Sequence, residues 1–175
     1  PPGTSKSYLL QVFFPAWVWA KDPTRRFGIF SYSADPMQQP KQAFLKLITS
    51  DWWQKRFGRL RIVRDNDKEG IVNSKGGSIY RGTVGGPLIG MHPHFLLIDD
   101  PHKALDVYSQ KLMRKALRWF ASSVASRGMM QRMAIVVCMQ RLAPNDLCGA
   151  LLGEMLSGAQ EMPDELKADL EDLVW

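Results

Sequence analysis

A lysine and a serine stand just before the first apolar segment of the chain, in a pattern that suits phosphate binding. Residues 1–7 read Pro-Pro-Gly-Thr-Ser-Lys-Ser. A phosphate-binding loop needs backbone N–H groups at the start of a helix, a lysine for the phosphate oxygens and a hydroxyl for Mg²⁺. The loop would consist of Gly3, Thr4, Ser5, Lys6 and Ser7, with Lys6 on phosphate and Ser7 on Mg²⁺. The alternative for this stretch alone is a polar helix cap.

Two adjacent aspartates follow a short apolar run, which is the pattern of an acidic Mg²⁺ site at the end of a buried strand. The run is Phe95-Leu96-Leu97-Ile98, and Asp99 and Asp100 come directly after it. In this pattern the first carboxylate holds hydrated Mg²⁺, and the second polarises the water that attacks the γ-phosphate. The alternative is an ordinary turn at Asp-Asp-Pro. Together with the phosphate loop, the pair predicts ATP and Mg²⁺ as cofactors and ATP hydrolysis as the reaction.

A third polar group follows a longer apolar run. Residues 133–139 are apolar throughout and are followed by Gln140 and Arg141. In many ATPases of the phosphate-loop class, a polar residue at this place senses the γ-phosphate, so Gln140 is a candidate catalytic residue. Arg141 would pair with an acid or contact phosphate. The simpler alternative is that both residues cap a strand.

The elements that must position these groups alternate between helix and strand along the chain. Helices are expected at 8–19, 37–49, 104–126 and 146–156, and strands at 27–33, 60–63, 70–73, 78–84, 95–98 and 133–139. The pattern predicts an α/β domain with a mostly parallel sheet, flanking helices and a hairpin-rich middle stretch. The strand at 133–139 reads as central and buried on both faces. Ligands of such sheets bind at the carboxyl ends of the strands, where the polar groups fall.

The composition sets broad limits. The chain has 175 residues, of which 45% are hydrophobic and 23% charged, and its net charge is +6. Such values exclude a low-complexity or disordered chain, and the basic excess is compatible with an anionic partner such as nucleic acid. The apolar segment at 8–20 is shorter than the roughly 20 residues that span a bilayer. Cys138 and Cys148 read as reduced thiols of a cytosolic protein.

A basic cluster in the middle of the chain is a candidate DNA contact. It consists of Lys55, Arg56, Arg59, Arg61 and Arg64, interleaved with Trp52, Trp53 and Phe57. Positive charge dominates affinity for the DNA backbone. The alternative is a solvated face whose aromatic side chains lie in the core. A second basic set, on the helix expected at 104–126, would contact DNA or a neighbouring subunit of a ring; it comprises Lys111, Arg114, Lys115 and Arg118.

Taken in order, these segments resemble the large terminase subunit of tailed bacteriophages. The segments that carry the resemblance are Pro1–Ser7, Phe13–Trp19, Ser31–Ser33, Ser50–Gln54 with Phe57-Gly58, Asn73 with Gly76-Gly77, and Val84–Gly86 before Gly90. The best matches within the chain are Leu97–Pro101 and Ile135–Leu142 with Asp146-Leu147. The resemblance extends from Pro1 to about Leu152. The order and spacing of the motifs are more specific than any one of them.

The resemblance implies a motor that uses ATP to drive double-stranded DNA into a procapsid in the cytoplasm of an infected bacterium. It implies a partial phosphate-loop ATPase domain over residues 1–156, without its first core strand, and an acidic tail or linker at 157–175. It also implies a portal, a small terminase subunit and a homo-oligomeric ring as partners, and no membrane. By position, Lys6 would bind phosphate, Ser7 and Asp99 Mg²⁺, Asp100 would be the catalytic carboxylate, and Gln140 would lie in the motif that couples hydrolysis to movement.

Three features depart from the family pattern. Ser5 stands where phosphate loops usually have glycine, Asp100 is shorter than the usual glutamate, and residues 84–94 diverge from the usual glycine run. Two other functions therefore stay open: another nucleic-acid motor of the helicase kind, and a degenerate phosphate-loop module without turnover. His92, His94 and His102 do not have the spacing of a metal site.

Overall fold

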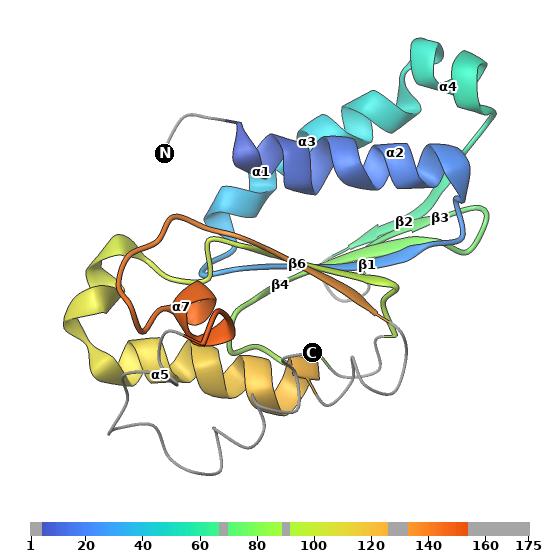
Figure 1. Ribbon diagram of the computed structural model, residues 1–175. Coiled ribbons are helices and arrows are strands. Elements are labelled where there is room, and N and C mark those ends of the chain that lie inside the picture. The colour runs from blue at the N-terminus through green and yellow to red at the C-terminus, as the bar shows by residue number, and fades with distance from the viewer. Residues whose placement is uncertain (1–4, 67–69, 89–91, 126–132, 154–175) are drawn as a thin grey trace.

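The computed structural model describes residues 5–66, 70–88, 92–125 and 133–153 (Figure 1). Gly3 and Thr4 of the expected loop and the tail at 157–175 lie outside these residues. The helical elements are α1 (Lys6–Tyr8), η1 (Leu9–Phe13), α2 (Phe14–Lys21), α3 (Asp35–Thr49), α4 (Asp51–Phe57), η2 (Ala104–Tyr108), α5 (Gln110–Trp119), η3 (Phe120–Ala125) and α7 (Leu147–Leu151). The strands are β1 (Arg26–Ser31), β2 (Ile62–Asn66), β3 (Gly70–Asn73), β4 (Ser78–Thr83), β5 (Phe95–Asp99) and β6 (Ala134–Cys138).

The six strands form one mixed, mostly parallel sheet in the order β2-β3-β4-β1-β5-β6. The pairs β4–β1, β1–β5 and β5–β6 are parallel, whereas β2–β3 and β3–β4 are antiparallel. The predicted α/β class and hairpin-rich middle are therefore confirmed. The parallel register sets Ile98 of β5 beside Phe30 and Val137, so the strands that precede the polar groups end at the same edge of the sheet.

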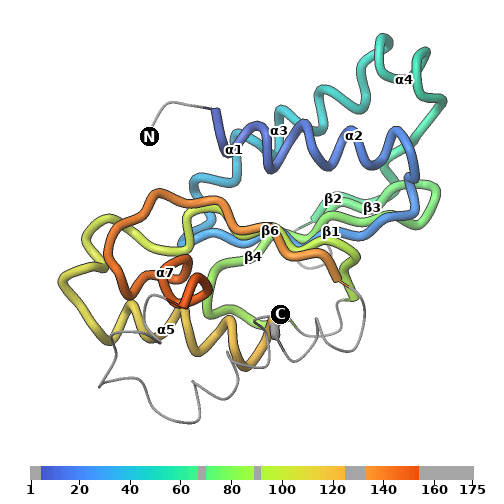
Figure 2. Tube along the Cα trace, in the orientation of Figure 1, coloured from blue at the N-terminus to red at the C-terminus, as the bar shows by residue number. Residues whose placement is uncertain are grey.

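Helices cover both faces of the sheet, as Figures 1 and 2 show. Alternate residues of β1 and β5 face opposite layers because strand side chains alternate with a period of two. Ile29 and Leu97 pack with α2, α3 and α4, whereas Phe30, Leu96 and Ile98 pack with α5, η3 and α7. The strands β1 and β5 are therefore packed between two hydrophobic cores, one on each face of the sheet. This packing holds the carboxyl ends of both strands in place. Within the described residues, no helix is both long and apolar enough to cross a membrane.

The first helix is continuous from Lys6 to Lys21 and includes one π-helical turn, η1. Because residues 8–19 are apolar on nearly all sides, the sequence predicts a buried helix, and this prediction is wrong for one face. Leu9, Phe13 and Trp17 recur at four-residue spacing and are all exposed. The opposite face, with Leu10, Val12, Ala16 and Trp19, is buried against the sheet and α3.

The single long helix predicted at 104–126 is also wrong. A 3₁₀ turn ends at Tyr108, Ser109 is extended, and α5 begins at Gln110 with the Ser109 hydroxyl accepting the N–H of Leu112. A serine is well suited to this N-cap role. The sequence predicts an apolar stripe of Leu105, Tyr108, Leu112, Ala116, Trp119 and Phe120. The last three are buried, but Leu105, Tyr108 and Leu112 are exposed, and Met113 and Leu117 are buried in their place.

Strand β6 is an edge strand in the described chain, whereas the sequence predicts a central strand buried on both faces. It pairs only with β5 among the described strands. Val136 is consequently 37% exposed, and Ala134 is exposed as well. An apolar run predicts burial but not which strand lies on either side, which explains the error.

In the hairpin region, Asp65-Asn66-Asp67 and Lys75-Gly76-Gly77 have the composition of turns, and the structure has a turn at the second of these places but not at Asp65 and Asn66. The turn between β3 and β4 forms at Lys75–Gly77, with Gly76 at φ 88° and the Asn73 side chain accepting the N–H groups of Lys75 and Gly77. Strand β2, expected at 60–63, instead extends to Asn66, so Asp65 and Asn66 belong to the strand rather than to a turn.

The corrected phase of α5 can be tested by comparing two leucines. Leu117 is 2% exposed and Leu112 is 44% exposed. Leu117→Ala should lower the free energy of unfolding by about 2–5 kcal/mol, because it leaves a cavity in the core. Leu112→Ala, the matched control, should lower it by less than about 1 kcal/mol. Urea unfolding measures both, and equal losses would contradict the register of α5.

Candidate phosphate-binding and catalytic site

The helix that carries Lys6 and Ser7 begins directly after a residue in the left-handed conformation. Ser5 has φ 56° and ψ 20°, and its side chain makes no cap hydrogen bond. Glycine adopts this conformation without cost, whereas other L-residues lose about 1–2 kcal/mol in it. The backbone at this position thus has the left-handed conformation that favours glycine. Ser5, which replaces the usual glycine of a phosphate loop, therefore adopts it at a conformational cost.

The start of this helix is tied to the end of β5 by a buried hydrogen bond. The Gln11 side-chain amide donates to Asp99 Oδ2 over 2.7 Å, and both side chains are almost wholly buried. Gln11 lies four residues after Ser7, so the two share one face of the helix. The Ser7 hydroxyl lies near enough to Asp99 to act on the pKa of its carboxyl group, which it lowers. The first turn of the helix and the aspartate therefore meet, although 88 residues separate Gln11 from Asp99.

Asp99 is a carboxylate held in an unfavourable environment. Burial raises its pKa above the usual value, the nearby charge of Asp100 adds to the rise, and Ser7, Gln11 and Lys6 oppose it. Its second oxygen, Oδ1, is buried and has no hydrogen-bond partner within the described part of the chain; the same holds for Oε1 of Gln11. An unpartnered carboxylate oxygen beside a serine hydroxyl is a donor set that fits a hard divalent cation such as Mg²⁺.

Asp100 links the ends of three strands. Its N–H donates to the carbonyl of Cys138 at the end of β6, and its carbonyl accepts the N–H of Tyr32 just after β1. Its Oδ1 accepts the backbone N–H of Gln140 over 3.2 Å. The residue has φ 44°, a left-handed conformation that costs a non-glycine residue about 1–3 kcal/mol. These three hydrogen bonds hold the Asp100 carboxylate in place despite that cost.

The segment after Gln140 is organised by a buried aspartate. Asp146 accepts N–H groups from Leu142, Ala143 and Gly149, and its carboxylate pairs with Arg141. Burial acts to raise the pKa of Asp146, but these hydrogen bonds outweigh it and the pKa lies below the usual value. Of the two roles considered for Arg141, pairing with an acid is therefore the one observed.

A cavity of about 330 Å³ adjoins these residues. Its lining includes Asp100, Gln140, Tyr32, Lys103 and His102. The Lys103 ammonium lies 5.4 Å from the centre of the Tyr32 ring, within the range of a cation–π contact. The volume falls at the lower end of the range of about 300–1,000 Å³ that is typical of small-molecule sites. The cavity thus presents a carboxylate, an amide and a cation to a polar ligand.

The four groups predicted to surround one triphosphate lie as follows. Asp100 and Gln140 line the same cavity, whereas Lys6, Ser7 and Asp99 are not among its lining residues. Asp99 precedes Asp100 at the end of β5. Lys6 lies close enough to lower the pKa of both Asp99 and Cys138 by its charge. Gly3 and Thr4 are outside the described residues. Sequence reasoning missed Gln11 and Lys103; a single glutamine within an apolar helix was the available signal for Gln11.

The predicted basic cluster lies elsewhere, on α4 and the chain leading into β2. Lys55, Arg56, Arg59, Arg61 and Arg64 are all exposed. Trp53 is buried, but Trp52 is 63% exposed and its ring contacts the half-exposed Phe57 edge to face at 5.9 Å. The alternative in which all three aromatic side chains lie in the core is therefore wrong for Trp52 and Phe57.

The histidines are not gathered into one group. His94 directly precedes β5, and its Nδ1 atom accepts the N–H of Arg26, the first residue of β1. His102 lies beyond the end of β5 and accepts the N–H of Leu147. No group of three or more His, Cys, Asp or Glu side chains suited to a metal occurs in the described ranges. Burial raises the pKa of both cysteine thiols, which keeps them protonated at neutral pH.

Comparisons with known proteins add no relationship. No protein-family model matches the chain, and a search of the curated proteins found no match either.

Because the pKa of Asp99 is raised, we expect this carboxyl group to lower the stability of the folded protein by an amount that depends on pH. A carboxyl group whose pKa is raised on folding contributes stability below its unfolded pKa, near 3.8, and loses that contribution as the pH rises through the folded pKa. Asp99→Asn should therefore raise the thermal midpoint at pH 7, with a gain that shrinks as the pH falls toward 3.8. Asp35→Asn, at an exposed carboxylate, is the control for the removal of one charge. A variant less stable than the parent at pH 7 would show that Asp99 stabilises the fold.

Proposed function

We propose that this chain is an ATP-hydrolysing module of a viral DNA-packaging motor, of the kind that the large terminase subunit represents. The observation that carries the proposal is the contact of Ser7 and Gln11 with Asp99. It joins the start of a helix, which attracts phosphate, to a buried acidic strand end, which attracts Mg²⁺. The α/β sheet, with its polar strand ends at one edge, is compatible with this function but not specific to it.

In this proposal each residue has a separate task. Lys6 and the backbone at the start of α1 would bind the phosphates, while Ser7 and the unpartnered oxygen of Asp99 would hold Mg²⁺. Bound Mg²⁺ would neutralise negative charge on the phosphates. Asp100, oriented by the N–H of Gln140, would direct the attacking water and accept its proton. The buried Gln11 amide would keep Asp99 in place.

The bond between Asp100 and Gln140 also supports a coupling role. A carboxylate that gains a proton becomes a weaker acceptor, so the hydrogen bond from the Gln140 N–H would weaken at the moment of proton transfer. Gln140 follows β6 and precedes the segment organised by Asp146. Hydrolysis would thereby weaken the hydrogen bond that ties the segment between β6 and α7 to Asp100.

The open edge of β6 supports a further element of the proposal. An apolar strand that pairs on one side only, among the described strands, favours the addition of another strand. The resemblance implies a strand that leads into the phosphate loop, and this edge is where it would pair. Such a strand would restore the central position that the sequence of β6 predicts.

A degenerate module without turnover is the second candidate. The observation in its favour is the left-handed Ser5, because a side chain at this position carries a conformational cost that glycine avoids. Both candidates predict a folded α/β domain, so only nucleotide binding and turnover separate them.

Two substitutions separate binding from catalysis. Lys6→Ala should weaken the binding of a fluorescent ATP analogue with Mg²⁺ by at least about tenfold, since it removes a charge-assisted hydrogen bond. Asp100→Asn should keep the binding and lower steady-state ATP hydrolysis by about 10²–10⁴-fold. Lys21→Ala, at the far end of the same helix, is the matched control and should change neither. Binding without turnover in the parent protein would favour the degenerate module, and unchanged values in both variants would refute the site.

The exposed basic cluster should contact double-stranded DNA, which packaging requires. Replacing Lys55, Arg56 and Arg59 by alanine should weaken DNA binding and reduce the slope of log K against log salt by about 0.9 for each phosphate that is no longer neutralised. A double variant with Lys111→Ala and Arg118→Ala removes basic charge from the exposed side of α5. It tests whether the loss of basic charge elsewhere on the surface has the same effect on DNA binding. An unchanged slope in the triple variant would place the DNA-binding surface elsewhere.

A further inference from the structure

An arginine occupies a core-facing position on a strand inside the sheet. Arg81 lies on β4, two residues after the fully buried Ile79, and its partner in the parallel register is the fully buried Ile29 of β1. Side chains two residues apart on a strand share a face, so Arg81 points toward the layer of α3. The pattern of the strand calls for an apolar residue at this position, and the chain has a cation instead.

The guanidinium of Arg81 is buried without a hydrogen-bond partner. All three of its nitrogens are inaccessible to solvent, and none has a partner in the part of the chain that the structure describes. Burial lowers its pKa to about 10, so the group stays charged at neutral pH. The Phe44 ring, 6.0 Å away, offers only a distant cation–π contact. Buried charges are usually paired, and an unpaired one is a strong sign of an absent counter-ion.

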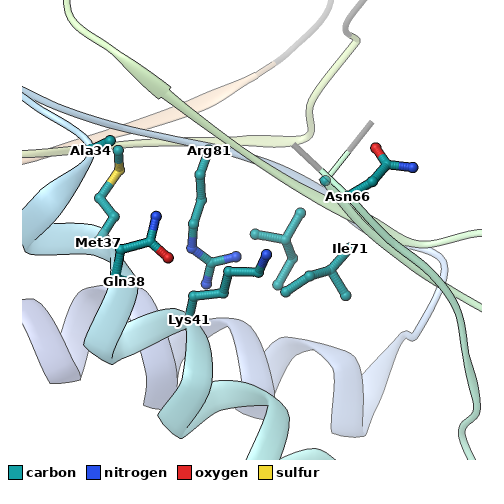
Figure 3. A pocket seen from close by; sticks show the side chains of 9 residues that line it. Ala34, Met37, Gln38, Lys41, Asn66, Ile71 and Arg81 are labelled. Atoms are coloured by element: carbon teal, nitrogen blue, oxygen red, sulfur yellow. The ribbon is translucent and has the colours of Figure 1, made fainter. Parts of the chain in front are cut away.

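Arg81 is among the residues that line a cavity of about 230 Å³ between α3 and the hairpin strands. Figure 3 shows the Arg81 guanidinium, the Gln38 amide and the Lys41 ammonium turned toward this space. Asp65 is near enough to act on Arg81 by its charge, but its carboxylate pairs with Lys41 at 2.7 Å, so the two cations together leave an excess of positive charge. The rest of the lining is mostly apolar, with Met37, Ile71 and Ile79, and also includes Asn66.

We infer that this cavity binds a small oxyanion of the phosphate class, held by the guanidinium of Arg81 with Lys41 and Gln38 beside it. A guanidinium presents parallel N–H groups that match two oxygens of such an anion. The volume is below the roughly 300–1,000 Å³ of sites for larger ligands, which favours a single phosphate group over a whole nucleotide. Strand β1 separates β4 from β5, so this site is distinct from the one at Asp99.

Thermal unfolding in inorganic phosphate, against chloride at equal ionic strength, tests the inference. Phosphate at about 100 times its dissociation constant should raise the thermal midpoint by about 5–10 °C. The rise should persist in Lys6→Ala, which removes the other candidate phosphate site, and in Arg26→Met, a matched control at an exposed arginine. With Lys6→Ala already present, it should disappear when Arg81→Met is added. Arg81→Met alone should be at least as stable as the parent without phosphate, because it replaces an unpaired buried charge by an apolar chain.

A second variant keeps the test decisive if Arg81→Met fails to fold. Gln38→Glu places a carboxylate in the cavity, so it should raise the midpoint in chloride and, with Lys6→Ala present, abolish the response to phosphate. A 5′-phosphorylated oligonucleotide in place of free phosphate distinguishes a phosphate carried by a larger molecule, provided that its effect also depends on Arg81. The inference is overturned if phosphate has no effect on the parent, if the effect vanishes in Lys6→Ala, or if, with Lys6→Ala present, it survives both Arg81→Met and Gln38→Glu.

Discussion

The hydrogen bond between the Gln11 amide and the Asp99 carboxylate is the interaction on which the site depends. It joins a helix near the start of the chain to a strand end 88 residues later, inside the protein and away from solvent. A buried carboxylate without such a donor costs several kcal/mol, so the docking of the helix and the ionisation of Asp99 depend on each other. Because Ser7 lies one turn before Gln11, the same docking brings the serine hydroxyl to the carboxylate. The left-handed Ser5 and Asp100 flank this contact, and local strain of this kind concentrates at functional sites.

The elements that position the site were largely predictable, because they depend on local patterns. Alternating and apolar runs located β1, β3, β4 and β5 to within one or two residues, and the Lys75-Gly76-Gly77 turn formed as its glycines require. The errors arose where tertiary context decides. An apolar run cannot reveal that β6 lies at an edge, and helical periodicity across Ser109 conceals the N-cap that divides the segment. Gln11 looked like an isolated polar residue in an apolar helix, since its partner becomes visible only once β5 and the helix are packed together.

Two buried charges of opposite sign lie on different strands of the sheet. Asp99, at the end of β5, is partly compensated by Gln11 and Ser7 and keeps one oxygen without a partner among the described residues. Arg81, on β4, has no compensation within the described residues except the nearby charge of Asp65. Apolar side chains at either position would make a more stable domain, so both charges indicate function more strongly than stability. The two positions also call for opposite ligands, a cation at Asp99 and an anion at Arg81.

Paramagnetic broadening by Mn²⁺, a substitute for Mg²⁺, tests the central claim most directly. With the isotopically labelled protein and a non-hydrolysable ATP analogue, Mn²⁺ should broaden the amide NMR signals of Ser7, Asp99 and Gln140. The signals of His94 and Lys75, at the opposite end of the parallel strands, should stay sharp. Broadening at His94 or Lys75 instead, or sharp signals at all five residues, would contradict a metal–nucleotide site assembled around the Gln11–Asp99 contact.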